Sequence, residues 1–340
     1  MPNKDPCDAT ASSARDVPEL SAPAALQALL GDLKLDRFLA EFYGRSPVHR
    51  QSAGQPGRFK SLIDWPVLER LLNMTGCWDE TRLRLVADGR RLPPEHYCFA
   101  LNGTDGEPRA WRPQPERVMG ALNAGATLVL NGLDGLVPAI GRLAHGLETA
   151  LNVRVQSNLY LSRRGHRGLP LHYDIHDVLA LQISGTKRWR WYAHRAHPGS
   201  KVPPERELRA QAGTVEREIT LEAGDLLYLP AGVIHEAMAQ SDQSLHLTFG
   251  LKQITPLDVA SLVMQHLSAR PDMTAPCYDL QEGAPALAQH IADLAAQCAR
   301  LGNDPAALAS LLARIEANRQ PRGRYVLEPD RPVGQGNHPA

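Results

Sequence analysis

Hydrophobic and polar positions change their spacing along the chain, and each change predicts a different kind of element. Over residues 24–43 and 62–72 apolar residues recur at helical spacing, which predicts amphipathic helices. Residues 82–89 alternate polar and apolar positions before a glycine turn, which predicts a strand. From Gly125 onward, short apolar segments stand between Gly and Pro residues. These segments predict a helix at 137–151 and strands at 127–131, 153–161, 187–192, 216–221, 226–229 and 244–251.

Short strands at this spacing indicate an antiparallel barrel or a double-sheet jelly roll. The stretch from Asn102 to Pro115 is rich in Gly and Pro, so we expect a loop there, beside a substrate cleft. After Thr255-Pro256 the period becomes helical again, over 257–267, 284–301 and 305–317. The predicted fold is therefore mainly β with helical additions. We divide the chain into a disordered leader (1–22), N-terminal helices and edge strands (23–113), a barrel (114–252), a C-terminal helical region (253–318) and a tail (319–340).

Composition argues mainly against certain classes of partner and location. The 340 residues have a formal net charge of zero, so no bulk charge favours direct binding of nucleic acid or an anionic membrane. The five cysteines are odd in number and show no CxxC spacing, which is typical of reduced thiols. The first residues lack the apolar core of a signal peptide, and no apolar run is long enough to span a bilayer. We therefore expect a cytoplasmic protein without a membrane partner.

The candidate chemistry lies in His172-Tyr173-Asp174 and in the distant His235. Two imidazoles and one carboxylate can occupy one face of an octahedral metal and leave open positions, as in non-haem Fe(II) oxygenases. We expect the close pair on a strand, because residues two apart in a strand share a face. His235 follows a Pro-Ala-Gly turn, from which a neighbouring strand returns to the same pocket. The plainer alternative is a strand histidine and an aspartate that satisfy backbone groups near a turn.

The sequence around this pair carries a family resemblance. The H-x-D motif is followed by an apolar segment ending in Gln182, a turn at Gly185, and basic residues directly before Trp189. This order resembles the metal-binding stretch of the JmjC/cupin-type 2-oxoglutarate oxygenases, and in particular the bacterial cupin subgroup that includes the ribosomal oxygenases. The resemblance covers roughly residues 36–252 and also includes the segments 125–132, 158–161 and 245–251. It implies a double-stranded β-helix (jelly-roll/cupin) core, bound Fe(II), and 2-oxoglutarate and O2 as cosubstrates.

The resemblance also implies roles for individual residues. Iron would be bound by His172, Asp174 and His235, and the distal carboxylate of 2-oxoglutarate by Lys187, whose alternative is a lysine that points from a turn into solvent. Further cosubstrate contacts would come from Asn158, Tyr160 and Thr248, each of which is otherwise an ordinary strand residue. We expect His246 to pack or to orient a ligand. His176 and Asp177 either orient the metal ligands or simply end the strand, and we favour the strand end.

Three functions fit these residues. The first is an oxygenase that hydroxylates an amino-acid side chain in a protein or peptide, as the resemblance implies. The second is an oxygenase of a free amino acid or natural-product intermediate, which would need a closed pocket instead of a long groove. The third is a non-catalytic metal-binding cupin, against which the cosubstrate cation Lys187 argues. The apolar residues of the helices between Pro256 and Ala317 further predict a symmetric homodimer, with packing of these helices onto their own barrel as the alternative.

Overall fold

The computed structural model describes residues 22–166, 168–199, 203–317 and 319. Apart from Ala22 and Arg319, the predicted leader and tail lie outside these residues. The described strands are β1 Val48–Arg50, β2 Leu83–Ala87, β3 Arg90–Arg91, β4 Cys98–Asn102, β5 Pro108–Pro113, β6 Thr127–Asn131, β7 Arg154–Ser162, β8 Asp177–Ser184, β9 Lys187–Arg195, β10 Val215–Leu221, β11 Leu226–Leu229, β12 Val233–Ala239 and β13 Ser244–Lys252. The helices are α1 Ala22–Leu30, α2 Leu35–Arg37, α3 Trp65–Asn73, α4 Pro115–Asn123, α5 Pro138–Leu151, α6 Glu205–Gln211, α7 Pro256–Leu267, α8 Ala284–Gly302 and α9 Pro305–Ala317.

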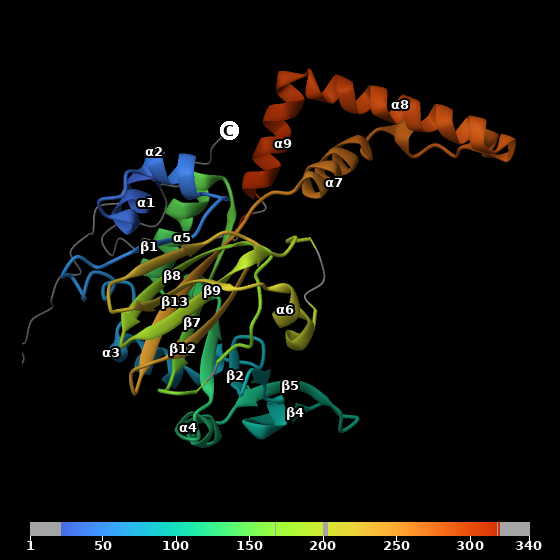
Figure 1. Cartoon of the computed structure of the whole chain (residues 1–340). Coiled ribbons are helices and arrows are strands. Elements are labelled where there is room, and N and C mark those ends of the chain that lie inside the picture. Colours follow the sequence, from blue (N-terminus) through green and yellow to red (C-terminus); the bar gives the residue numbers. More distant parts are fainter. Residues whose placement is uncertain (1–21, 167, 200–202, 318, 320–340) are drawn as a thin grey trace, which may run out of the picture.

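The strands form two facing sheets and a separate hairpin (Figure 1). The large sheet has the antiparallel order β1-β11-β8-β13-β7-β6-β2-β3, and the small sheet has the order β10-β9-β12. The faces of the two sheets meet in the interior: Trp189 on β9 lies edge-on to His246 on β13, with ring centroids 5.7 Å apart. Two sheets of short antiparallel strands with side chains between them confirm the predicted jelly-roll core.

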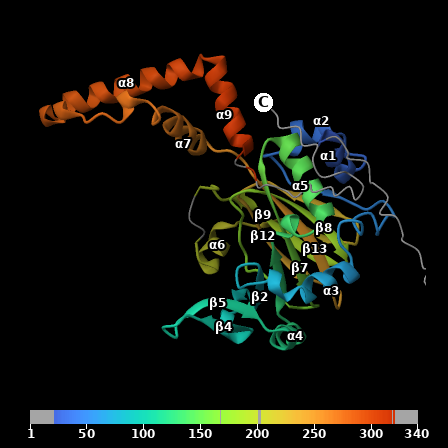
Figure 2. The ribbon, with the colours of Figure 1, turned by 180° about the vertical axis from the view of Figure 1, so that it is seen from behind.

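Alternation along β7 separates the two faces of the large sheet. Val155 and Leu159 are buried in the main apolar core, together with residues of α1, α3 and α5 such as Leu26 and Leu147. Seen from behind, these helices lie across that face of the sheet (Figure 2). The alternate residues Asn158 and Tyr160 point the other way and line the pocket between the sheets. The helical layer therefore supports one face, and the opposite face is left to line the interior.

The N-terminal helical prediction is only partly right. The single periodic segment 24–43 forms α1, then α2, and then a π-helical turn over Phe38–Phe42. The break comes at Gly31, which has a φ of +66° and ends α1 in the left-handed region. The helix predicted at 62–72 is α3, whose N-terminus is capped by the side chain of Asp64.

The loop predicted from Asn102 to Pro115 is wrong in part, because β5 lies within it. This strand pairs with β4 in an antiparallel hairpin, with Phe99 opposite Arg112. The hairpin closes through a hydrogen bond of 2.8 Å from the Gly103 amide to the Glu107 carbonyl. Its two prolines, Pro108 and Pro113, stand at the ends of β5, where a missing amide hydrogen does least harm to the pairing.

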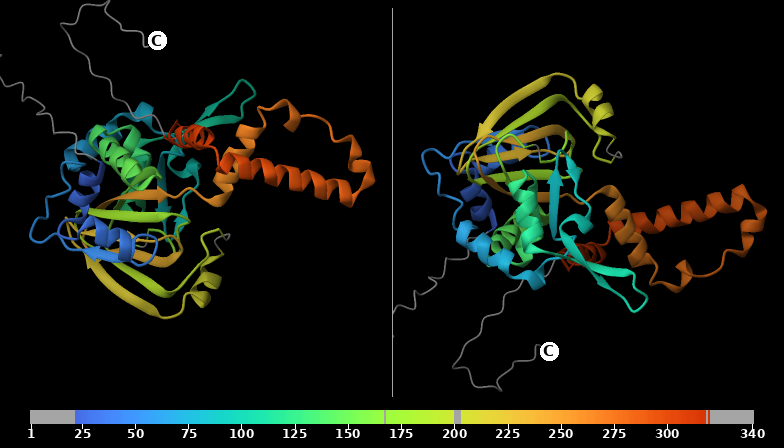
Figure 3. Two further views of the ribbon diagram at one scale, coloured as in Figure 1. Left: turned by 90° about the horizontal axis from the view of Figure 1, so that it is seen from above. Right: turned by 90° about the horizontal axis from the view of Figure 1, so that it is seen from below.

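The three C-terminal helices confirm the periodicity of the sequence almost residue for residue. Together α7, α8 and α9 form an arm that extends away from the two sheets (Figure 3). Helix α7 begins with a capping box, in which Thr255 and Asp258 bond each other's backbone amides. Among the helices that the structure describes, none combines the length and the apolar character that crossing a bilayer requires.

Candidate metal centre and adjoining pocket

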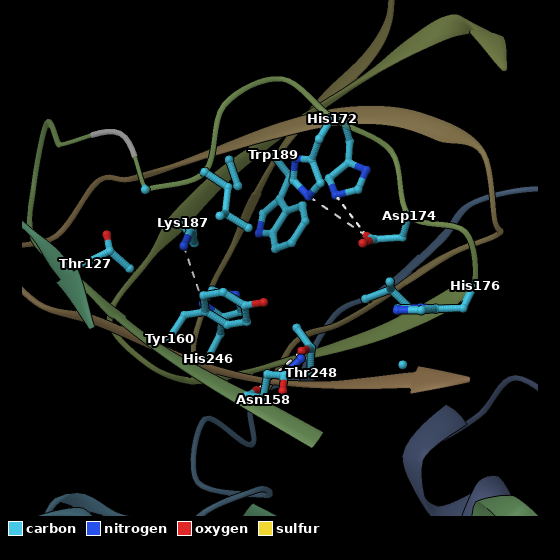
Figure 4. Close-up of a pocket in the computed structure, with 16 residues that line it drawn as sticks. Thr127, Asn158, Tyr160, His172, Asp174, His176, Lys187, Trp189, His246 and Thr248 are labelled. Carbon is cyan, nitrogen blue, oxygen red and sulfur yellow. Dashed lines mark hydrogen bonds and ion pairs between the residues drawn. The ribbon is translucent and has the colours of Figure 1, made fainter. Parts of the chain in front are cut away.

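His172, Asp174 and His235 come together in the wall of one pocket. Figure 4 shows His172 and Asp174 there. One ligand atom from each residue lies within 4.8 Å of the others. The Asp174 Oδ2 atom is 3.7 Å from Nε2 of His235 and 4.0 Å from Nε2 of His172. A metal held at distances of about 2.0–2.2 Å by imidazole nitrogen and carboxylate oxygen fits between atoms with this spacing. The three predicted ligands therefore form one compact donor set.

The backbone that presents these ligands differs from the prediction. His172 and Asp174 precede β8, and His172 pairs with His235 in an isolated antiparallel bridge through hydrogen bonds of 3.1 and 2.8 Å. After this bridge the chain is irregular through Asp174, and β8 begins only at Asp177.

Each histidine is oriented by a backbone carbonyl. His172 Nδ1 lies 2.8 Å from the Pro170 carbonyl oxygen, and His235 Nδ1 lies 2.9 Å from that of Val233. A carbonyl accepts only, so Nδ1 carries the hydrogen and Nε2 is left with its lone pair toward Asp174. Burial, and then the neighbouring His172, lower the pKa of His235 to about 4. Neutral imidazole, the form that binds metals, is therefore the state of this residue at neutral pH.

The triad lines one part of a pocket that encloses about 160 Å³, and Lys187 lines another (Figure 4). Lys187 is only 4% exposed, and its Nζ lies 3.4 Å from Ser162 Oγ and 3.5 Å from His246 Nδ1. Both contacts are longer than ordinary hydrogen bonds. Burial lowers the pKa of Lys187 to about 7. This cation is poorly satisfied by its neighbours, so an anionic ligand would stabilise it.

The other three predicted cosubstrate residues line the same pocket. Thr248 on β13 is paired with Asn158 on β7, and its hydroxyl donates to the Asn158 carbonyl at 3.3 Å. The Asn158 Oδ1 atom is buried without a hydrogen-bond partner among the described residues. Burial raises the pKa of Tyr160, so its hydroxyl remains a neutral donor. These side chains thus add polar groups to the wall near Lys187, whose Nζ is 5.9 Å from the Tyr160 ring centroid.

Sequence reasoning gave no role to Trp189 and only a loose one to His246 and His176, all of which line the pocket. The His246 ring stacks on Tyr160 with centroids 4.7 Å apart, and Trp189 stacks on His235 at 5.7 Å. Alternation along β9 offered a signal, because Trp189 follows Lys187 by two positions and shares its face. No such signal exists for His176, because it lies in the irregular segment before β8.

Comparison with known sequences identifies the domain. The JmjC domain family matches residues 138–259, which include the triad and Lys187. The protein named bifunctional lysine-specific demethylase and histidyl-hydroxylase NO66 of Dictyostelium discoideum is 40% identical over 236 residues, covering 67% of this chain and 43% of the relative. Ribosomal oxygenase 2 of Mus musculus is 40% identical over 241 residues, covering 68% and 48%. The chain thus spans less than half the length of these curated relatives.

Among solved structures, the Escherichia coli ribosomal oxygenase YcfD is similar with a TM-score of 0.55 and 20% identity, over 87% of this chain and 74% of that one. A structure of YcfD with cobalt and 2-oxoglutarate gives a TM-score of 0.56 and 19% identity, over 89% and 76%. At this identity the similarity supports the fold. Together with the donor set between the two sheets, the family match identifies residues 138–259 as a JmjC domain.

Proposed function

We propose that this chain is an Fe(II)- and 2-oxoglutarate-dependent oxygenase that hydroxylates an amino-acid side chain in a protein or peptide. One observation carries the proposal: a histidine-histidine-aspartate donor set and a buried, poorly satisfied lysine share one small pocket. A metal-binding cupin without cosubstrate has no use for such a cation. An oxygenase that must hold a dicarboxylate beside its metal needs both groups.

The donor set suits the ion. His172 and His235 offer Nε2 lone pairs and Asp174 a carboxylate oxygen, the ligand types of a non-haem Fe(II) site with open positions. When bound, iron and 2-oxoglutarate supply the redox chemistry that uses O2 to hydroxylate a C–H bond. The protein supplies binding and orientation.

Lys187 pairs with the distal carboxylate of the cosubstrate, which gives a buried ammonium the partner that it lacks. Tyr160 and Thr248 offer hydroxyl groups on the same wall. The rings of Trp189 and His246 line the pocket between this wall and the metal ligands and give it apolar faces. The cosubstrate would thereby be held between Lys187 and the metal ligands.

The names of the relatives support a polypeptide substrate. They describe a histidyl-hydroxylase, a lysine-specific demethylase and ribosomal oxygenases, all of which act on side chains of proteins. We therefore place a protein or peptide side chain, together with O2, beside the metal ligands.

The test is 2-oxoglutarate turnover by the anaerobically purified, iron-loaded protein after admission of O2, in the presence of cell lysate or peptide pools. We expect succinate and a peptide product heavier by one oxygen atom. His172→Ala and Asp174→Ala should abolish both, because each removes a ligand. His96→Ala, at an exposed histidine outside the pocket, is the matched control and should keep full activity. Full activity in either triad variant would contradict the proposal.

We also propose that the arm of α7, α8 and α9 pairs with a second copy of the chain. These helices bury few of their apolar residues, namely Leu267, Ala286, Ala307 and Leu311. By contrast, Leu257 is 76% exposed, Ile291 59% and Leu312 54%. An arm with this much exposed apolar surface gains most by covering it, and twofold pairing is the commonest closed arrangement.

Light scattering at micromolar concentration tests the pairing. We expect twice the chain mass of 37.2 kDa, and the chain mass itself after Ile291→Asp or after truncation at Gln253. Gln289→Asp, on the same helix, is the control and should leave the mass doubled. A single-chain mass for the unmodified protein, or a truncated protein that stays paired, would contradict this arrangement.

A further inference from the structure

The carboxylate of Asp177 joins the two segments that carry the candidate metal ligands. Asp177 is the first residue of β8, three positions after Asp174, and only 2% of it is exposed. Its Oδ2 accepts a hydrogen bond of 2.5 Å from the Tyr228 hydroxyl, and its Oδ1 accepts one of 2.8 Å from the Ala231 amide. Ala231 belongs to the turn between β11 and β12, and β12 carries His235. One side chain thus connects the segment of Asp174 with the turn that leads to His235.

The three ligands are not held equally. His172 and His235 are fixed to each other by two backbone hydrogen bonds. Asp174 lies in the irregular segment before β8, and its carbonyl accepts one bond of 2.9 Å, from the Gly232 amide. The position of its carboxylate therefore depends on what anchors the chain directly after it, and the anchor is Asp177.

The Tyr228 partner is itself firmly held. Its hydroxyl oxygen accepts a hydrogen bond of 2.7 Å from the Gly44 amide, and its ring packs edge-on against Phe38 at a centroid distance of 5.0 Å. Burial raises the pKa of Asp177, whereas the bonds from Tyr228 and Ala231 favour its carboxylate form. Two donors, one on each oxygen, suit an ionised carboxylate that accepts only.

We infer that Asp177 is a positioning residue for the metal triad, whose carboxylate sets the placement of Asp174 relative to His235. The inference rests on the proposed metal centre and makes no use of the substrate. Groups that orient metal ligands without touching the metal typically change metal affinity by about 10–100-fold when they are replaced. A residue with a purely structural role would change stability and leave the affinity and the ligand geometry as they were.

The experiment measures Co(II) binding to the full-length, metal-free protein by the visible absorption of the bound ion, which reports ligand number and geometry without turnover. In Asp177→Asn, the single amide oxygen cannot replace both acceptors, so the bond from either Tyr228 or Ala231 is lost, and we expect the Co(II) dissociation constant to rise about 10–100-fold with a changed spectrum. Tyr228→Phe removes one of the two bonds and leaves the charge of Asp177. It should show a smaller rise, and it keeps the inference testable if Asp177→Asn does not fold.

Asp225→Asn is the matched control. Asp225 is a buried aspartate, 3% exposed, directly before β11, and it accepts bonds of 2.8 Å from His49 Nε2, 2.7 Å from the Ser52 amide and 3.1 Å from the Glu222 amide. It contacts none of the triad residues in the described structure. We expect it to lower the unfolding midpoint while keeping the Co(II) affinity and spectrum of the unmodified protein.

Two results would overturn the inference: an unchanged affinity and spectrum in both Asp177→Asn and Tyr228→Phe, or equal losses in Asp177→Asn and Asp225→Asn. Failure of the unmodified protein to bind Co(II) is a different result. It would remove the proposed metal centre itself, and the inference with it.

Discussion

Replacing Lys187 by Met should make the protein more stable and its cosubstrate binding weaker. Lys187 is 4% exposed, and burial lowers its pKa from 10.5 to about 7. At about 1.4 kcal/mol for each pH unit, this change corresponds to roughly 4–5 kcal/mol against the charged form in the folded chain. Methionine has a similar length and no charge, so it fills the same space without that penalty.

The stability gain in Lys187→Met should depend on pH. Between pH 7 and 10.5 the unfolded chain binds a proton at Lys187 that the folded chain has lost. Stability therefore rises with pH across this window, and the penalty is fully present below pH 7. At pH 7 we expect Lys187→Met to unfold with a free energy about 3–4 kcal/mol above that of the unmodified protein. The difference should shrink steadily toward pH 10.5.

Cosubstrate affinity should change in the opposite direction. Loss of a buried charge pair costs about 2–5 kcal/mol, which raises the dissociation constant of 2-oxoglutarate tens-fold or more. The assays are urea unfolding at pH 7 and pH 10 and calorimetric binding to the Mn(II)-loaded protein. Lys252→Met, at an exposed position on β13, is the control and should change neither quantity. A stability gain that is absent or independent of pH, or an unchanged affinity, would refute the reasoning.

Two glycines give further expectations. Gly185 has a φ of +67°, and a Cβ there would collide with the Gln243 carbonyl. Gly185→Ala should therefore lower the free energy of unfolding, measured by urea denaturation, by about 1–3 kcal/mol or more. An unchanged free energy of unfolding would contradict the strained turn. At Gly250 a Cβ would lie 2.7 Å from the His176 ring, which lines the pocket. Gly250→Ala should therefore slow 2-oxoglutarate turnover without weakening Co(II) binding, and unchanged turnover would show that His176 has room to move.

Regular elements could be predicted from the sequence because their side chains have a fixed period. The buried run Leu226–Leu229 and the alternating segment at 154–162 are strands, and the Ala/Leu-rich segments after Pro256 are helices. The hairpin of β4 and β5 escaped prediction because its strands are stabilised by pairing with each other and carry prolines at the ends of β5. Period alone does not report such pairing.

The candidate site, like the fold, was predicted only in part from the sequence. Residue types and spacing made His172, Asp174 and His235 candidates, and the family resemblance assigned them as iron ligands and added Lys187. The sequence misplaced the first two on a strand, because the irregular backbone before β8 leaves no periodic pattern. It also favoured a plain strand end at Asp177, whose hydrogen bonds reach residues far away in the chain. Contacts of that kind depend on the closed fold and leave no local pattern.

The backbone bridge between His172 and His235 has a consequence for folding. These residues lie far apart in the chain, so their pairing forms only after the intervening strands have assembled, and non-local pairings of this kind form slowly. An unfolded chain offers a metal ion the close pair without the third ligand, and therefore binds it weakly. Metal binding should accordingly stabilise the closed barrel in full, by about 2.7 kcal/mol at a free concentration one hundred times the dissociation constant. Because the ion recognises only the finished arrangement, adding metal should raise the unfolding midpoint, and the rise should grow with the free metal concentration.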